Sequence, residues 1–437
     1  MGTNFLKVNV SKKNILFFAI GLIFVVLLSS ITFTAQINNL LAIGVLVLSV
    51  LFVFKCRKNM MLLIMSIFIS YCNYSVSVGI YLFPDSNTCP FYSQITDIRV
   101  YGIGIVLLFL FMYFIVLFMP NNFVDSSASF AKVFIRKENN DALLFAVITA
   151  GYIFILFSGY EIVGNARGIT SPLYEYNNVL LILMFYYSGD YNFRKIISSF
   201  LAIVYSLTSF LNGTRIEAII CIIIVLLCLL KKKIPVPLII SSIIVGLVVF
   251  NIIGIFRGNY QTDSNMIQLA VDKLVENKMV FDTCTFAYFP MLCMVEMFLE
   301  YSFVDAMYFL FRFFLTIILG VVGIEDGNLI HYVLDSYFHA GGGFSLGFFY
   351  VWFSYLAPLI FAMIVCFIIN SIVREKQSCR DSKLAVVLYL IATVPRWYLY
   401  GPWSLTRGLL ICFIVFLLSN IIHKNLSNLK ATKRLVE

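Results

Sequence analysis

Residues 101–119, YGIGIVLLFLFMYFIVLFM, decide the fold class, because these nineteen consecutive residues carry no charged side chain. A helix of about 20 apolar residues spans the hydrocarbon core of a bilayer. The rest of the chain has the same character: 61% of its 437 residues are hydrophobic, 12% are charged, and the mean hydropathy is +0.95. Soluble domains carry about 25% charged residues. The sequence therefore predicts an all-α polytopic membrane protein.

Twelve apolar runs approach the length of a spanning helix, which predicts about twelve transmembrane helices. They lie at about 14–34, 39–54, 60–82, 101–119, 142–159, 178–189, 196–211, 216–230, 236–256, 344–371, 384–400 and 408–422. The first run follows Lys12 and Lys13, as the apolar part of a signal peptide would. No small-residue cleavage site is evident and further runs follow, so we interpret it as a retained first helix.

One long segment, residues 257–343, does not fit a bundle with short loops. It begins polar and becomes aromatic and apolar. Its hydrophobic pieces 283–299 and 303–322 also contain proline and charged residues, which favours interfacial or re-entrant helices against the bundle. If both cross as a hairpin, the count rises from about twelve to fourteen. The predicted organisation is 1–256 with transmembrane helices 1–9, a large outer loop at 257–343, and 344–437 with helices 10–12 and a basic tail.

The positive charges fix the expected sidedness. Starting with the N-terminus inside, 22 of the 31 Lys and Arg residues fall inside and 9 fall outside, as the positive-inside rule requires. Both tails are basic, so both termini are expected in the cytoplasm. The inner set has 6 Arg and 16 Lys, whereas the outer set has 7 Arg and 2 Lys. Because topology needs only positive charge, the outer arginines indicate a second role: the guanidinium group binds phosphate or carboxylate oxygens through two hydrogen bonds.

Several function classes are not supported by the residues. No GxxxxGK[ST] motif is present, so the sequence predicts no use of ATP. No CxxC or Cys/His spacing indicates a metal site, and we expect neither metal nor cofactor. The net charge of +9 follows the topology instead of forming a patch, so no nucleic-acid partner is expected.

Four outer arginines are expected at one depth in the membrane, where they could form an anion-binding ring: Arg215, Arg257, Arg396 and Arg407. The alternative for each is that it extends to the interface or pairs with an acid. Glu217, two residues from Arg215, is the obvious local partner of that arginine.

Histidine is scarce in this chain. His339 precedes Ala340 and a run of three glycines that leads into the span at residue 344. A histidine beside a glycine run at the membrane surface can approach a lipid-borne substrate and exchange protons near neutral pH. The alternative is an ordinary loop histidine. His423 falls in the predicted cytoplasmic tail and is interpreted as a tail charge.

Four short motifs, in order, resemble Wzy polymerases, which join repeat units of bacterial O-antigens and related oligosaccharides. FLNGTR at 210–215, followed by an aliphatic helix, is similar to a characteristic element of that family. IFRG at 255–258 resembles the arginine that opens their large periplasmic loop, and HAGGGFSLG at 339–347 resembles the segment that closes it. Residues 395–407 resemble their paired arginines around the last periplasmic turn. The resemblance covers about 205–422; FYV at 349–351 departs from the acidic pattern of many relatives, so we place no catalytic carboxylate there.

The resemblance implies a GT-C-like membrane glycosyltransferase in the bacterial inner membrane, with its active site facing the periplasm. Its substrates would be glycans on undecaprenyl pyrophosphate, and the growing glycan would pass to the non-reducing end of a new lipid-linked repeat. A chain-length-regulating membrane protein is an implied partner. The implied pyrophosphate-binding residues are Arg215, Arg257, Arg396 and Arg407, with Arg312 and Arg167 as lesser candidates. His339 is the first choice as base and Glu217 the second.

Two other functions stay open. An O-antigen ligase shares the fold and the donor but transfers the glycan to lipid A core. Ligases tend to have a His-Asn pair in the large loop, whereas Ala340 follows His339 here, which favours a polymerase. A lipid-linked oligosaccharide flippase or other transporter usually has repeat symmetry and charges at mid-bilayer, whereas this chain is expected to hold its charges at the outer surface.

Overall fold

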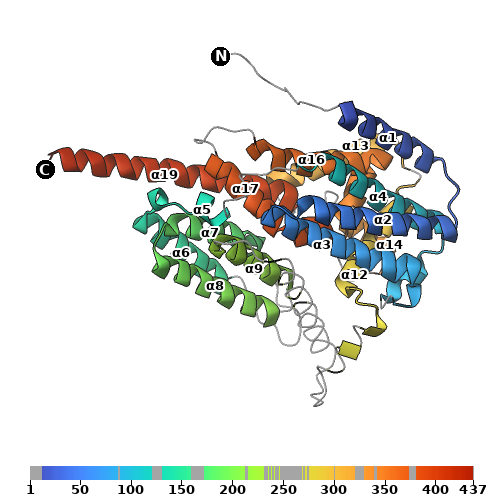
Figure 1. Ribbon diagram of the computed structural model, residues 1–437, viewed down its shortest axis with the longest axis horizontal. Helices are drawn as coiled ribbons and strands as arrows, with labels where there is room; N and C mark the ends of the chain where they lie inside the picture. The colour runs from blue at the N-terminus through green and yellow to red at the C-terminus, as the bar shows by residue number, and fades with distance from the viewer. Residues whose placement is uncertain are drawn as a thin grey trace. The chain divides into compact units, whose positions relative to one another are not determined.

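The computed structural model describes residues 12–86, 89–120, 130–158, 172–211, 215–230, 275–299, 301–319, 329–338, 342–373 and 380–436, with a few isolated positions between 235 and 272. All regular elements in these ranges are helices (Figure 1), which confirms an all-α membrane protein. Six helical segments in this part of the chain are long and apolar enough to cross a membrane: Ala35–Cys56, Met60–Leu82, Ile98–Phe118, Asn192–Phe210, Ser345–Ser371 and Ser404–Asn428. Three shorter apolar helices accompany them, at Leu16–Ser29, Ala142–Ser158 and Ile216–Leu229. The count of about twelve spans stays a prediction, and the run at 236–256 lies outside the described residues.

The chain forms two compact units, each assembled from separate stretches of sequence. The first unit comprises Met1–Lys55, Ser70–Asn121 and Asp282–Asn370, and the second comprises Cys56–Ile69, Asn122–Phe281 and Ser371–Glu437. The helices of the first unit are α1 (Lys12–Ser29), α2 (Ala35–Cys56), the end of α3 (Met60–Val76), α4 (Ile98–Phe118), α12 (Asp282–Met297), α13 (Phe303–Leu319), α14 (Leu329–Ser336), α15 (Ser345–Phe353) and α16 (Ala357–Val373).

Helix α4 is the central helix of the first unit. The carboxylate of Asp97 accepts a hydrogen bond from the Arg99 backbone N–H at 2.8 Å and so caps the helix. Helices α1 and α12 pack against α4. Tyr81 and Tyr288 share a 2.8 Å hydrogen bond between their hydroxyl groups, and the Tyr81 hydroxyl donates a second one, also 2.8 Å long, to the Tyr101 carbonyl. These bonds satisfy tyrosine hydroxyls in a buried, largely apolar region.

Helices α12 and α13 form within the predicted outer loop, close to the expected 283–299 and 303–322, and the shorter α14 follows them there. Helix α12 is buried from Cys284 to Val295 except at Phe286, and it packs against α4, α14 and α15. Helix α13 exposes apolar side chains, with Phe303 at 77% and Ile318 at 77% of full exposure, and packs against α15. Whether either helix lies in the membrane interface stays a prediction.

The predicted span 344–371 has a break in its middle. Ser354 has φ +48°, and a 3-10 turn at Ser354–Leu356 separates α15 from α16. Pro358 stands in the first turn of α16, where its missing N–H breaks no helical hydrogen bond.

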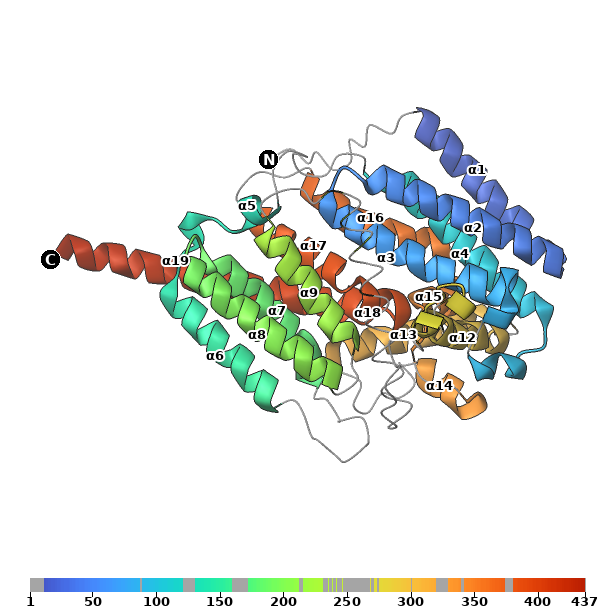
Figure 2. The same cartoon turned by 60° about the horizontal axis from the view of Figure 1, so that its bottom comes forward.

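The second unit contains α5 (Phe130–Phe134), α6 (Ala142–Ser158), α7 (Pro172–Ser188), α8 (Asn192–Leu211), α9 (Arg215–Leu229), α17 (Arg380–Ala392), α18 (Val394–Leu399) and α19 (Leu409–Val436). Helices α6, α7, α8 and α9 lie side by side, as Figure 2 shows. The predicted run 384–400 is divided between α17 and α18. Helix α19 extends well beyond the predicted 408–422, so much of the predicted basic tail is helical.

Helix α8 has the polarity of a lipid-facing helix. Its exposed side chains recur every three or four residues and form an apolar stripe, here called the outer stripe: Phe193, Ile196, Phe200, Ile203 and Leu207. Its opposite face is buried and carries hydroxyl groups: Ser198, Tyr205, Ser206 and Ser209. A helix on the surface of a soluble protein has the reverse arrangement. Lipid is therefore the medium that suits the outer stripe.

Candidate functional site

An ion pair in the second unit joins two of the predicted site residues. The Arg396 guanidinium Nη2 donates a hydrogen bond to Glu217 Oε1 across 179 positions of the chain. The side chains are 23% and 4% exposed, respectively. Glu217 lies in the first turn of α9, where the helix dipole favours a negative charge. Sequence proximity indicates Arg215 as a partner of Glu217, which stays a prediction because the Arg215 side chain lies outside the described residues. The described partner is a distant arginine.

The short helix α18 holds Arg396 in place. The Trp397 Nε1 donates to the Leu390 carbonyl at 2.7 Å, and the Thr393 hydroxyl donates to the Tyr389 carbonyl at 2.7 Å. Pro395 lacks an N–H and stands in the first turn of α18, where such a residue is tolerated. The residues on either side of Arg396 in α18 are buried, whereas Arg396 is partly exposed. Helix α18 packs against α9, and this packing fixes the arginine near α9.

Arg407 belongs to the next element along the chain, the π-helical turn η8 (Ser404–Gly408). π-Helical turns occur often at functional sites. The guanidinium carbon lies 5.8 Å from the centre of the Tyr176 ring of α7, within the range of a cation–π contact. Gly408 permits close packing next to Arg407, since a Cβ atom there would meet the Tyr389 hydroxyl oxygen at 2.4 Å.

The elements that carry these residues are neighbours. Helix α18 contacts both α9 and η8, and α7 contacts α9. The structure therefore gathers Glu217, Arg396 and Arg407 within one group of packed elements. Helix α9 begins at Arg215, whose side chain lies outside the described residues.

The other predicted site residues are not part of this group. Arg312 lies on α13 in the first unit, where its Nε donates to the Tyr308 hydroxyl at 3.0 Å and its guanidinium lies 5.4 Å from that ring. Arg167, Arg257 and His339 lie outside the described residues. No group of three or more His, Cys, Asp or Glu side chains in the described ranges is arranged to hold a metal ion.

A polar cluster between α7, α8 and α9 was not predicted from the sequence. The Tyr205 hydroxyl donates to the Tyr174 carbonyl at 3.0 Å, and the Tyr174 hydroxyl lies 3.1 Å from the Ser209 hydroxyl. One helical turn after Tyr174, the Cys221 thiol of α9 donates to Asn178 Oδ1 of α7 at 3.1 Å. The signal that could have revealed this cluster is the Asn177–Asn178 pair inside an apolar run, because polar groups in a membrane helix usually face the bundle interior.

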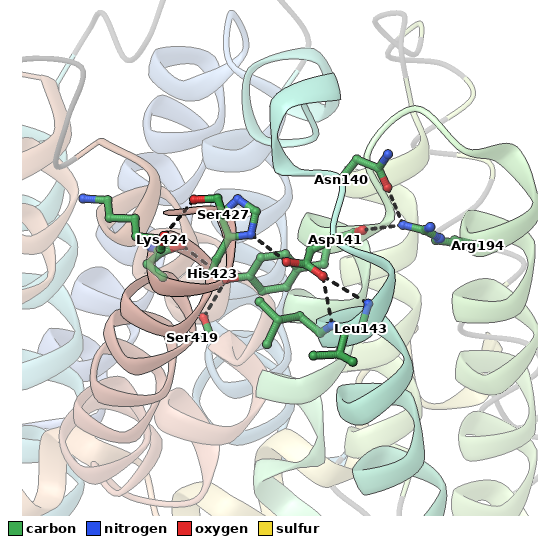
Figure 3. A network of polar contacts seen from close by, with 11 residues as sticks. Asn140, Asp141, Leu143, Arg194, Ser419, His423, Lys424 and Ser427 are labelled. Carbon is green, nitrogen blue, oxygen red and sulfur yellow. Dashed lines mark hydrogen bonds and ion pairs between the residues drawn. The ribbon is translucent and has the colours of Figure 1, made fainter. Parts of the chain in front are cut away.

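A second polar network lies at another part of the same unit (Figure 3). His423 Nδ1 is 2.9 Å from Asp141 Oδ2, while Asp141 Oδ1 accepts the Leu143 backbone N–H at 3.0 Å. Nearby, Arg194 Nη1 donates to Asn140 Oδ1 at 2.5 Å. His423 thus lies on α19 and contacts the start of α6, which places it in a helix-to-helix link and not in a free tail. Each of these contacts joins residues of the chain to one another, so we interpret the network as structural.

A comparison of the chain with family models, with curated proteins and with solved structures finds no match in any of the three.

Proposed function

We propose that the chain is a membrane glycosyltransferase that polymerises oligosaccharide repeat units carried on undecaprenyl pyrophosphate. The observation that carries the proposal is the Glu217–Arg396 ion pair, with Arg407 on the adjacent turn. All three residues fall in the stretch that resembles Wzy polymerases. The arrangement supports this function because the elements that carry Arg396 and Arg407 are neighbours and each guanidinium is held by its own contact.

The proposed reaction requires positive charge near the leaving pyrophosphate. In the reaction, the bond between C1 of the growing glycan and its pyrophosphate oxygen breaks, and C1 forms a bond to a hydroxyl of the acceptor sugar. The hydroxyl proton passes to a base, and undecaprenyl pyrophosphate leaves with the bonding electrons. Preorganised cations lower the barrier where that charge develops. Arg396 and Arg407, with Arg215 and Arg257, are the residues proposed to bind the donor and acceptor pyrophosphates, and Arg312 and Arg167 are second candidates.

Glu217 has a positioning role in this proposal. Its carboxylate holds the Arg396 guanidinium in one orientation before substrate arrives, which limits the entropy lost on binding. A pyrophosphate would then compete with the carboxylate for the guanidinium. His339 is the proposed base for the acceptor hydroxyl, and Glu217 is the alternative.

The proposal includes the setting of the reaction. We place the chain in the bacterial inner membrane with both termini in the cytoplasm and the site facing the periplasm, on the positive-inside rule. A membrane protein that regulates chain length is the proposed partner.

The test is a lipopolysaccharide gel of a strain that lacks this chain. A polymerase defect leaves a single repeat on lipid A core, and the wild-type gene restores the ladder. Bare core together with polymer retained on undecaprenyl pyrophosphate would identify a ligase instead. Bare core without such polymer would identify a flippase, and either result would overturn the proposal.

A further inference from the structure

A pocket of about 1040 Å³ opens on the second unit, away from the ion pair, where α5 and the turn after it meet the start of α8 and the end of α9. Helix α5 contacts α9 and α8 contacts α9, and all three are visible in Figure 2. Three lysines line the pocket, here called the basic rim: Lys132, Lys137 and Lys195.

Cations outnumber acids among the described residues that line the pocket. Arg136 also lines it, but its guanidinium pairs with Asp381, which also accepts a hydrogen bond from the Tyr186 hydroxyl at 3.1 Å. Asp190 is the acid among the described lining residues. Among the described residues that line the pocket, four are cations and one is an acid, and Asp381 pairs with Arg136 without lining the pocket. A site of this charge suits an anion.

Apolar side chains also line the pocket and form what is here called its apolar wall. It includes Phe200 and Ile203 of the outer stripe, which are 62% and 55% exposed, together with Leu229 of α9. The pocket is therefore continuous with the surface that suits lipid. A soluble anion would contact only the basic rim and would leave the apolar wall without a ligand. An amphiphile would contact both.

We infer that this pocket binds an anionic phospholipid, with the phosphate at the basic rim and an acyl chain along the outer stripe of α8. Basic pockets between membrane helices are recognised sites for acidic lipid headgroups. The positive-inside rule assigns this end of the helices to the cytoplasmic leaflet. The inference is independent of the proposed glycosyltransferase function, since it uses none of the residues of that site.

The experiment is lipid binding to the purified full-length chain in neutral detergent, measured by native mass spectrometry with dioleoyl-phosphatidylglycerol. Dioleoyl-phosphatidylcholine, which has the same acyl chains and no net charge, is expected to bind much more weakly. Each lysine near a membrane surface contributes a factor of about five, so the double variant K132Q/K195Q is expected to bind phosphatidylglycerol about 25-fold more weakly. The matched control is K58Q, which removes an exposed cation that does not line the pocket.

A second variant tests the apolar wall. I203S keeps the basic rim and shortens the wall, and it is expected to weaken phosphatidylglycerol binding several-fold while thermal unfolding stays close to that of the unmodified chain. Equal binding by K132Q/K195Q and the unmodified chain would overturn the inference, as would an equal loss in K58Q. Displacement of the lipid by millimolar inorganic phosphate would also overturn it, because it would indicate a site for a free anion.

Discussion

The carboxylate of Glu217 on α9 accepts a hydrogen bond from the guanidinium of Arg396 on α18, and the carboxylate is almost fully buried. A buried carboxylate needs such a partner, because an isolated charge in a medium of low dielectric constant is strongly unfavourable. The pair therefore links the stability of this part of the second unit to the position of the proposed pyrophosphate-binding arginine.

A double-mutant cycle on this pair should show strong coupling. R396Q leaves the Glu217 carboxylate buried without its partner, and loss of one member of a buried pair destabilises by about 3–5 kcal/mol. E217Q is expected to be milder, because Arg396 is more exposed. The variant E217Q/R396Q should recover part of the loss, with a coupling energy of about 1–3 kcal/mol. The measurement is thermal unfolding in one detergent, and additive single effects would contradict the coupling.

R396K should abolish long glycan chains while the protein level stays unchanged. Lysine keeps the charge but loses the planar fork that holds both Glu217 and a pyrophosphate. The expected loss in the rate of chain extension is about 100-fold, as for removal of one preorganised donor. Lipopolysaccharide gels and immunoblots measure the two quantities. R57K, at an exposed arginine outside the site, is the matched control, and a normal ladder in R396K would refute the pyrophosphate assignment.

H339A should leave a single repeat attached to lipid A core but no polymer. The reason is that the acceptor hydroxyl loses its proposed base while the donor still binds. The readout is the same gel, with the single-repeat band as the internal control for export and ligation. If polymer persists near the normal level, the base is another group, and Glu217 is then tested with E217Q.

G408A should destabilise the contact between the start of α19 and α17. The added methyl group would lie 2.4 Å from the Tyr389 hydroxyl oxygen and 3.0 Å from two of its ring carbons. Overpacking of this kind costs about 1–3 kcal/mol. Because Arg407 is the adjacent residue, shorter glycan chains are expected as well. G151A is the matched control, since its nearest neighbour is 3.8 Å away, and Y389F should partly rescue G408A.

Cysteine labelling should establish the sidedness. In a C379S background, S93C is expected to react with a maleimide that cannot cross the inner membrane, whereas Y191C, at a side chain 54% exposed in the native chain, should react only after permeabilisation. The native thiols in the described ranges are all buried, and burial raises the pKa of Cys89 to about 11, so little reactive thiolate is present at neutral pH. Rapid labelling of Y191C in intact cells would contradict the predicted topology.

The long apolar runs were sufficient to predict most of the helices. The run at 60–82 coincides with a described helical segment, and that at 101–119 differs from α4 by a few residues, because an unbroken apolar sequence in lipid must satisfy its own backbone. The breaks were not predicted. Ser354 and Thr393 are ordinary residues inside apolar runs, and their irregular backbone depends on tertiary packing, which hydropathy does not record.

The positions of the candidate site residues along their helices were predictable, but their contacts were not. Arg396, Arg407 and Glu217 could be assigned to one end of their helices because each lies at the edge of an apolar run. The contact of Glu217 with Arg396 could not be predicted, because Arg396 lies in a distant segment and local spacing indicates only Arg215. The contact of Tyr176 with the Arg407 guanidinium was not predicted either. The sequence around an aromatic residue near the start of an apolar run does not indicate whether a guanidinium will contact its ring.

The inverted polarity of α8 also bears on how this protein can change over evolutionary time. Along the outer stripe, Ile196, Ile203 and Leu207 meet a fluid that accepts any aliphatic shape, so exchange among Ile, Leu, Val and Phe should be almost neutral there. The hydroxyl face meets fixed neighbours, and a change at Tyr205 or Ser209 removes a specific hydrogen bond. Sequence drift in α8 should therefore concentrate on its most hydrophobic positions, the reverse of the pattern in a water-soluble protein.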